Sequence, residues 1–297
     1  MVGKNLIRHL LQKGYKVIIL TRSAPEKLSG DNLSYAEWDV LKQTIDLHAL
    51  QSADAIIHLA GTSLVDKRWT ASYKKEIVES RTLSSKLLVD ALKQHSNSVK
   101  TIVSISAIGW YGPDKEKDRF FIETDPHSDD FLGQTCFEWE RSISEAGSLH
   151  IRVCKLRAGI VLSNDGGALA EFKKPLRFGI ATILGSGKQV MSWIHIDDLC
   201  RMFIHALENP LNGSYNAVAP ATVTNKQFTL TLAETLRGRS FIPVHVPSFV
   251  LKIVLGESSI EVLKSAAVSD KKIKDTGFTF LYPSLEAAFG QLTGKNL

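Results

Sequence analysis

The sequence contains few cysteines, and none of them is spaced like the ligands of a metal site. The three cysteines, Cys136, Cys154 and Cys200, are scattered through a chain of 297 residues. A small secreted protein held together by disulfides has more cysteines at closer spacing. We therefore expect free thiols, a reducing compartment, a cytoplasmic location and no bound metal.

Long apolar runs are absent as well. The longest, such as residues 17–20, fall far short of the roughly 20 apolar residues that a membrane-spanning helix requires. The opening stretch has no acidic residue before Glu26, which is also a feature of basic, amphipathic organelle leaders. We expect no membrane segment, and we prefer a helix of the fold to a leader for these opening residues.

Clustered basic charge is mostly missing too. The formal net charge is +5 and the isoelectric point is near 9.0, but basic and acidic residues are interspersed. A nucleic-acid-binding module groups its basic side chains or alternates them with aromatic ones. We expect no nucleic-acid partner. One basic group points either to an anionic small-molecule substrate or to a solvated surface: Lys173, Lys174, Arg177 and Lys188.

Short apolar runs alternate with longer helical patterns. Runs rich in β-branched residues predict strands at 15–20, 54–59, 101–106 and 150–156. Amphipathic spacing predicts long helices between them, notably at 71–94 and 131–146. This alternation predicts an α/β fold with a parallel, doubly wound sheet, which binds ligands at the carboxyl ends of its strands.

The pattern changes from about residue 220. Helical segments at 225–237, 248–255 and 285–292 follow without buried strands between them. They predict a smaller C-terminal domain on the substrate side. We accordingly divide the chain into a dinucleotide-binding domain and a small domain, with these bounds: residues 1–160 with about 190–220, and about 161–189 with 221–297.

The sequence around His195 predicts a strand that runs directly into a helix. Asp197 and Asp198 are expected to cap this helix, because a carboxylate there accepts free backbone N–H groups and interacts favourably with the helix dipole. A metal site is the alternative use of the same residues.

The chain opens directly into another helix. Leu6, Ile7, Leu10 and Leu11 form an apolar stripe at helical spacing, and Gly14 suits the position just after the helix. In a dinucleotide-binding fold, a buried strand and a glycine-rich turn precede such a helix, because the N–H groups of the turn hold the pyrophosphate. Only three residues precede it here.

Residues 2–7 resemble the end of the Gly-x-x-Gly-x-x-Gly fingerprint of extended short-chain dehydrogenases/reductases, with Gly3 as the last glycine. The resemblance implies a Rossmann-type sheet without its first strand and without two phosphate-approach glycines, roughly 10 residues in all. We interpret the chain as N-terminally truncated, or as one with a mis-assigned start, and expect the strands beside the gap to lack backbone partners. The alternative is that Gly3 is a small residue in a leader.

The residues after the first expected strand predict the cofactor. Thr21, Arg22 and Ser23 stand where such folds distinguish two related dinucleotides. An acidic side chain here would bind a ribose 2′-hydroxyl, whereas Arg22 with its neighbouring hydroxyls suits a 2′-phosphate. We therefore expect NADP(H) in preference to NAD(H). The alternative is an Arg22 that is simply exposed on a loop.

Two further segments resemble cofactor-contacting turns of the same family. Asp39 and Val40 resemble its adenine-contacting pair, and Leu59, Ala60 and Gly61 resemble the turn that passes under the cofactor. Small residues suit the second turn, because a larger side chain would block close approach of the backbone to the ligand. The resemblance implies that all five residues bind cofactor.

Residues 104–112 resemble the serine segment of the family. We predict that Ser106 holds the substrate oxygen, that Ser104 belongs to the cofactor site, and that Tyr111 lies near the nicotinamide as a substitute proton donor. The alternative for Ser106 is a hydroxyl that bonds to its own backbone.

The Tyr-x-x-x-Lys helix of the family is not found. A Tyr and a Lys four residues later share one helical face, so the Lys lowers the pKa of the Tyr. In the helix expected here, Leu132 and Cys136 take these positions, and neither does this chemistry. Tyr111 and Lys115 have the spacing, but the Gly-Pro between them disfavours a helix.

The resemblance narrows to one branch, the uncharacterised "epimerase family" proteins. It is carried by residues 156–167 and 184–199, and by residues 255–259 and 277–280, which are similar to the branch's C-terminal domain of unknown function. It implies an NADP(H)-binding protein that performs redox or epimerase chemistry on a small molecule. Loss of the Tyr–Lys pair favours the rival, a non-catalytic NADP(H)-sensing protein. A homodimer is left open.

Overall fold

The computed structural model describes residues 1–23, 30–114, 116 and 119–294. The strands are β1 (Val17–Thr21), β2 (Leu33–Asp39), β3 (Thr44–Ile45), β4 (Ala55–His58), β5 (Thr101–Ala107), β6 (Arg152–Ala158), β7 (Ile160–Leu162), β8 (Ile180–Leu184), β9 (Val190–Met191), β10 (Trp193–His195), β11 (Gly213–Ala217), β12 (Val223–Thr224) and β13 (Ile242–Val246). The α-helices are α1 (Val2–Gln12), α2 (Leu47–Gln51), α3 (Ala71–Gln94), α4 (Phe131–Ser144), α5 (Ala168–Leu176), α6 (Ile196–Glu208), α7 (Asn225–Arg237), α8 (Ser248–Leu255), α9 (Ser259–Leu263), α10 (Lys271–Lys274) and α11 (Leu285–Thr293). Three 3-10 helices are η1 (Ile108–Tyr111), η2 (Glu145–Leu149) and η3 (Gly256–Ser258). In none of the described helices does an apolar stretch reach the length that a bilayer demands.

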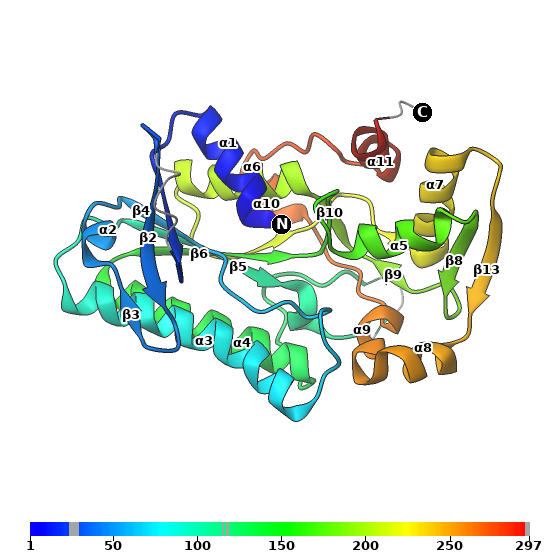
Figure 1. Cartoon of the computed structure of the whole chain (residues 1–297), viewed down its shortest axis with the longest axis horizontal. Helices are drawn as coiled ribbons and strands as arrows, with labels where there is room; N and C mark the ends of the chain where they lie inside the picture. Colours follow the sequence, from blue (N-terminus) through cyan, green and yellow to red (C-terminus); the bar gives the residue numbers. More distant parts are fainter. Residues whose placement is uncertain (24–29, 115, 117–118, 295–297) are drawn as a thin grey trace.

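The central sheet is parallel, in the order β11-β6-β5-β4. Successive side chains of a strand point to opposite faces, so each strand contributes to two cores. On one face, Val103, Cys154 and Leu156 pack with α1 and α6. On the other, Ile102 and Val153 pack with α3 and α4. Helices therefore cover both faces (Figure 1), and the predicted doubly wound α/β fold is confirmed.

Strand β1 belongs to a second sheet, in the order β1-β2-β3. It pairs in parallel with β2, with Val17 opposite Leu33. Among the described strands, no ladder of hydrogen bonds joins β1 to β4. The two sheets are thus separated between β1 and β4, which is the position where the motif resemblance places a further central strand. Strand β1 pairs only with β2, and β4 pairs only with β5, among the described strands.

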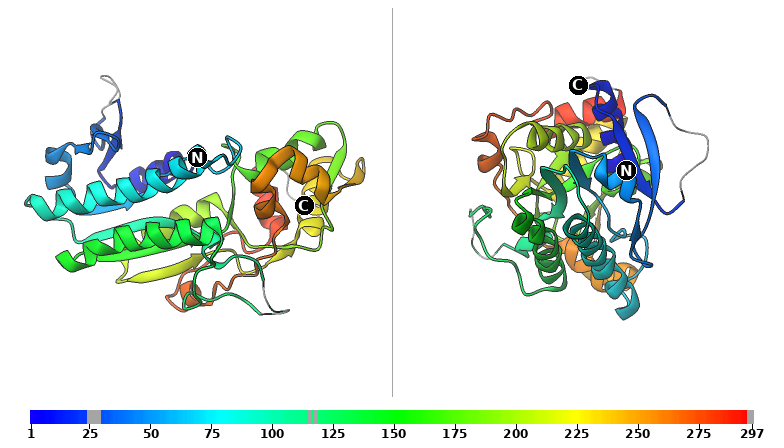
Figure 2. Two further views of the ribbon diagram at one scale, coloured as in Figure 1. Left: turned by 90° about the horizontal axis from the view of Figure 1, so that it is seen from below. Right: turned by 90° about the vertical axis from the view of Figure 1, so that its left-hand side faces the viewer.

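A third apolar core lies among the C-terminal elements. Trp193, Phe228 and Phe289 are fully buried in it, between α5, β8, α7 and α11. Figure 2 shows these elements gathered at one end of the molecule, beyond the paired helices α3 and α4. Strand β13 pairs with β8 there. Its residues are largely exposed, so this strand has no buried apolar run from which it could be predicted.

The predicted start of α6 is correct, but its predicted cap is wrong. His195 is the N-cap residue, and its Nδ1 accepts the backbone N–H of Asp197 at 3.1 Å. The buried carboxylate of Asp198 instead accepts the backbone N–H groups of Leu281 and Tyr282, at 2.8 and 2.9 Å. A carboxylate in this first turn therefore ties the C-terminal segment to α6.

Gly133 in α4 gives a stability prediction. A Cβ there would lie 2.1 Å from the backbone oxygen of Ser128, whereas a Cβ on Gly147 would meet nothing within 4 Å. We expect Gly133→Ala to lower the free energy of unfolding by at least about 1 kcal/mol, because the clash outweighs alanine's better helix propensity. Urea denaturation measures this loss, with Gly147→Ala as the control. Equal stability of the two variants would contradict the clash.

Candidate functional site

The first turn of α1 lies beside the turn that follows β4. A Cβ on Gly3 would stand 3.7 Å from Cδ1 of Leu59, so two segments predicted to contact the cofactor meet here. The helix has no side-chain cap and no acidic residue in its first turn. Its free N–H groups and the positive end of its dipole therefore suit an anionic group.

One carboxylate already lies near this helix end. Asp165 accepts a hydrogen bond from Nδ2 of Asn5 at 2.9 Å and lies 3.7 Å from Nζ of Lys4. The Asn5 hydrogen bond, followed by the Lys4 charge, lowers the pKa of Asp165. This contact joins residues 160 positions apart, and no site role was predicted for Asp165.

The residues predicted to select the cofactor lie at the carboxyl end of β1. Arg22 and Ser23 are exposed, and Thr21 ends the strand. Asp39 ends the neighbouring strand β2, and its Oδ1 accepts the backbone N–H of Lys42 at 3.1 Å. That backbone hydrogen bond is the main cause of the lowered pKa of Asp39. These residues therefore share one sheet edge, and Val40 follows them directly.

Gly61 packs closely against a protein side chain. A Cβ there would lie 3.1 Å from Cζ of Arg81. The Arg81 guanidinium is buried and donates to the carbonyl oxygens of Thr62 and Ile77, at 3.1 and 2.8 Å. The small residue in this turn thus lets the backbone approach Arg81. Ala60, before it, is half-buried.

Ser104 points into the buried layer between the sheet and α3. Its Oγ lies 3.2 Å from Nδ1 of His58, whose Nε2 lies 3.0 Å from Oγ of Ser84. Burial, helped by the charge of Arg81, lowers the pKa of His58 to about 4. His58 is therefore neutral at physiological pH, and the two serines hold its ring.

The strand register places further polar side chains on this same face. One row across the sheet contains His58, Ser104, Lys155 and Ser214, and the next contains Ser106, Arg157 and Asn216. The two rows share a face because they lie two residues apart along each strand, and successive side chains of a strand point to opposite faces. A band of buried polar groups therefore lies beneath α3 and α4.

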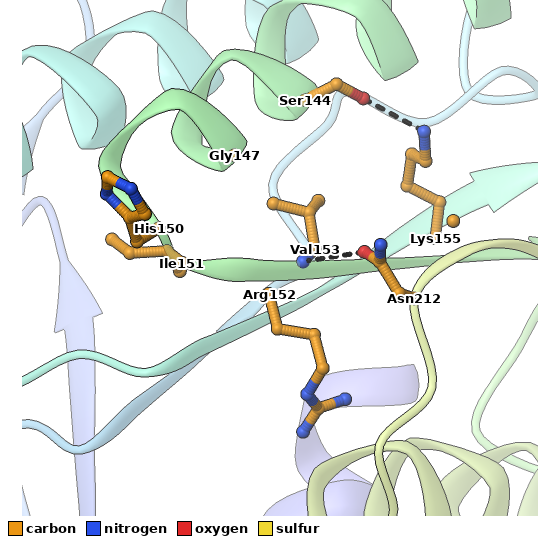
Figure 3. A pocket seen from close by; sticks show the side chains of 9 residues that line it. Ser144, Gly147, His150, Ile151, Arg152, Val153, Lys155 and Asn212 are labelled. Atoms are coloured by element: carbon orange, nitrogen blue, oxygen red, sulfur yellow. Dashed lines mark hydrogen bonds between the residues drawn. The ribbon is translucent and has the colours of Figure 1, made fainter.

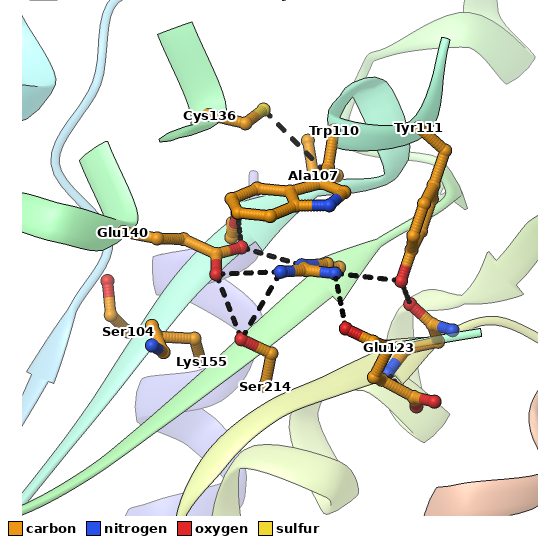
Figure 4. A network of polar contacts seen from close by, with 12 residues as sticks. Ser104, Ala107, Trp110, Tyr111, Glu123, Cys136, Glu140, Lys155 and Ser214 are labelled. Atoms are coloured by element: carbon orange, nitrogen blue, oxygen red, sulfur yellow. Dashed lines mark hydrogen bonds and ion pairs between the residues drawn. The ribbon is translucent and has the colours of Figure 1, made fainter. Parts of the chain in front are cut away.

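Glu140 and Arg157 form the centre of this band (Figure 4). Nε and Nη2 of Arg157 donate to the two carboxylate oxygens of Glu140, at 2.7 and 3.0 Å. Both side chains are almost completely buried, and the guanidinium lies 3.7 Å above the ring of Trp110. Burial favours the neutral acid, but the hydrogen bonds and charge of Arg157 outweigh it and lower the pKa of Glu140.

Both residues predicted to be catalytic bond to this pair or to its neighbours. The Ser106 hydroxyl donates to Oε1 of Glu140 at 2.8 Å. The Tyr111 hydroxyl donates to Oδ1 of Asn216 at 2.6 Å and accepts from Arg157 at 3.0 Å. Burial raises the pKa of Tyr111 above its usual value. The structure therefore brings Ser106 and Tyr111 into one network through Glu140 and Arg157.

The helix positions where the family carries Tyr and Lys are apolar or buried. Leu132 and Cys136 both pack against Gly109, and burial raises the pKa of the Cys136 thiol to about 12. Tyr111 ends η1 at Gly112, whose φ is 70°, so no helix continues toward Lys115, which lies outside the described residues.

Sequence analysis assigned no role to Glu140 or Arg157. Two signals were present: Glu140 stands four residues after Cys136 on one helical face, and Arg157 stands two residues after Lys155, so both cations point to the same face of an expected strand. Within the described ranges, no three His, Cys, Asp or Glu side chains are grouped to hold a metal ion.

Comparison with known proteins agrees with the motif resemblance. Residues 1–218 match the NAD dependent epimerase/dehydratase family, and residues 246–292 match a domain of unknown function, DUF1731. The Epimerase family protein SH2119 of Staphylococcus haemolyticus is 37% identical over 297 residues, covering 98% of this chain and 95% of that protein.

Two solved structures are similar over the whole chain. The human epimerase family protein SDR39U1 (isoform2), crystallised with NADPH, is 29% identical with a TM-score of 0.85, covering 99% of this chain and 96% of that chain. The nucleoside-diphosphate sugar epimerase of Corynebacterium glutamicum is 30% identical with a TM-score of 0.78, covering 100% of this chain and 57% of that chain.

Removal of the Glu140 charge is expected to destabilise the fold. Glu140→Gln leaves Arg157 buried without an anion, and breaking one partner of a buried ion pair costs about 3–5 kcal/mol. Urea denaturation at neutral pH measures the loss. Glu138→Gln is the control, since Glu138 forms an exposed pair with Arg141 on the same helix.

The difference in unfolding free energy between wild type and Glu140→Gln should depend on pH. Because the pKa of Glu140 is lowered in the folded state, its contribution is complete above the ordinary carboxyl pKa and is lost as pH falls through the folded value. The stability difference between wild type and Glu140→Gln should therefore shrink on acidification. A difference that stays constant down to strongly acidic pH would contradict the ion pair.

Proposed function

Because this chain belongs to the NAD dependent epimerase/dehydratase family, we propose that it binds NADP(H) along the carboxyl ends of β1, β2 and β4. The observation that carries the proposal is the exposed Arg22 directly after β1, between Thr21 and Ser23. The human relative crystallised with NADPH supports the same cofactor.

The remaining predicted residues complete this proposed site. The first turn of α1, which contains Gly3, receives the pyrophosphate on its free N–H groups. Asp39 and Val40 border the adenine, and the turn of Leu59, Ala60 and Gly61 passes under the cofactor. When bound, NADP(H) supplies or accepts a hydride, and the chain binds the cofactor and orients it against the substrate.

Arg22→Ser tests the cofactor assignment. We expect NADPH affinity to fall by about tenfold or more and NADH affinity to stay unchanged, because only NADPH has the 2′-phosphate that a guanidinium binds in a bidentate manner. Nicotinamide fluorescence titration measures both affinities, with Arg141→Ser in α4 as the control. The assignment fails if the wild-type chain binds no dinucleotide, or if both affinities fall equally.

For the catalytic step, Ser106 holds the substrate oxygen and Tyr111 donates the proton. Both hydroxyls are bonded to protein acceptors, so the substrate oxygen has to replace Glu140 or Asn216 as their partner. The raised pKa of Tyr111 keeps its phenol protonated at neutral pH, as a donor requires. The reaction proposed is reduction or epimerisation of a small carbonyl or hydroxyl compound.

A non-catalytic NADP(H) sensor is the second candidate. It is favoured by the buried Leu132 and Cys136 in α4 and by the closed hydrogen bonding of Ser106 and Tyr111. A sensor needs the nucleotide-binding residues but no free acid or base.

Turnover separates the two candidates. NADPH oxidation is followed with aldehydes, ketones and nucleotide-linked sugars. For an enzyme, Ser106→Ala should lower kcat/KM by about 100-fold or more while NADPH affinity is retained. Ser142→Ala in α4, whose hydroxyl donates only to the carbonyl of Trp139, is the control. An epimerase returns its hydride and consumes no NADPH, so the sugar mixtures are also analysed for the epimer by proton NMR. NADPH that binds tightly while none of these compounds is reduced or epimerised supports the sensor.

A further inference from the structure

A cavity opens at the amino end of β6, away from the strand ends proposed to hold the cofactor. Its volume is about 530 Å³, which is within the range of small-molecule sites. It lies between η2 and the turn that leads into β11 (Figure 3). The described lining residues include three basic side chains and no acidic one: Ser144, Gly147, His150, Ile151, Arg152, Val153, Lys155, Asn212 and Gly213.

Lys155 is a half-buried cation in this lining without a carboxylate partner. Its Nζ donates to Oγ of Ser144 at 2.9 Å, and no ion pair to it occurs within the part of the chain that the structure describes. Two of its three N–H donors are therefore left. Glu140, the acidic group that acts on it electrostatically, already accepts from Arg157, Ser106 and Ser214.

Arg152 and Asn212 also line the cavity, and each has a hydrogen-bond partner in the protein. The Arg152 guanidinium points away from Lys155 (Figure 3) and donates to the carbonyl oxygens of Ala206, Leu207 and Leu211, so it offers no donor beside Lys155. Asn212 accepts the backbone N–H of Val153 through Oδ1, and its Nδ2 stays available as a donor.

A half-buried ammonium without a counter-ion is costly to keep charged. Accordingly, burial, together with the charges of Arg157 and Lys272, lowers the pKa of Lys155 despite the opposing charge of Glu140. An oxyanion in the cavity would accept the two remaining N–H groups and supply the missing charge.

We propose that this cavity is a second ligand site, in which Lys155 binds the phosphate or carboxylate group of a small organic anion. Asn212 donates a further hydrogen bond to the same group. The cavity opens toward the amino end of β6, whereas the proposed cofactor site lies at the carboxyl ends of β1, β2 and β4; Lys155, in the middle of β6, lies between the cavity and the polar band.

Calorimetric titration of the full chain with glycerol 3-phosphate, glycerate and uncharged glycerol tests the proposal. We expect saturable binding of at least one of the two anions and none of glycerol, and the two anions distinguish phosphate from carboxylate. Lys155→Met should weaken anion binding by at least about tenfold, since it removes a charge-assisted hydrogen bond. Lys155→Arg should retain binding, and Lys86→Met, which removes an exposed lysine paired with Asp90, should leave it unchanged.

Two results would overturn the proposal. One is the absence of saturable binding of either anion at millimolar concentration, and the other is equal binding by wild type and Lys155→Met. If Lys155→Met does not fold, the ¹³Cε resonance of Lys155 in the wild-type chain replaces it and must shift on anion addition. Failure of NADPH to bind would not affect these readings, because glycerol 3-phosphate and glycerate are titrated without dinucleotide.

Discussion

The buried ion pair between Glu140 and Arg157 is the interaction on which the candidate site depends. It joins α4 to the carboxyl end of β6, and each Glu140 oxygen also accepts a serine hydroxyl, from Ser106 or from Ser214. A carboxylate and a guanidinium taken out of water are tolerated only when every donor and acceptor is paired. Neighbouring side chains are therefore constrained by this pair, including both residues that we propose as catalytic.

The central sheet consequently has two different faces. The face under α1 and α6 is apolar, with Cys154, Leu156 and Phe203 fully buried. The face under α3 and α4 carries the two rows of polar side chains, one of which contains Ser106 and Arg157. An apolar face tolerates small shifts in packing, whereas a satisfied polar band fixes one arrangement. The polar face is thus the one on which chemistry can be precisely positioned.

The C-terminal part is held to this sheet by hydrogen bonds as well as by its own core. The Ser192 hydroxyl donates to the carbonyl of Ala266 and accepts the N–H of Val268. Asp114, just after the Tyr111 segment, accepts from the Ser265 hydroxyl and from the backbone N–H of Ala267. The part of the chain that matches DUF1731 therefore contacts the loop that follows Tyr111.

The sequence by itself determined the fold class, the family and the long helices, and it supplied the segments from which a cofactor site is proposed. Helices at 71–94, 225–237 and 248–255 were predicted at their observed bounds, because helical period and capping are local properties. Only the tertiary structure decided that His195 caps α6, that Glu140 pairs with Arg157, and that Lys155 is left without a carboxylate. These outcomes depend on strand register and on which helix face meets the sheet, and a local pattern contains neither.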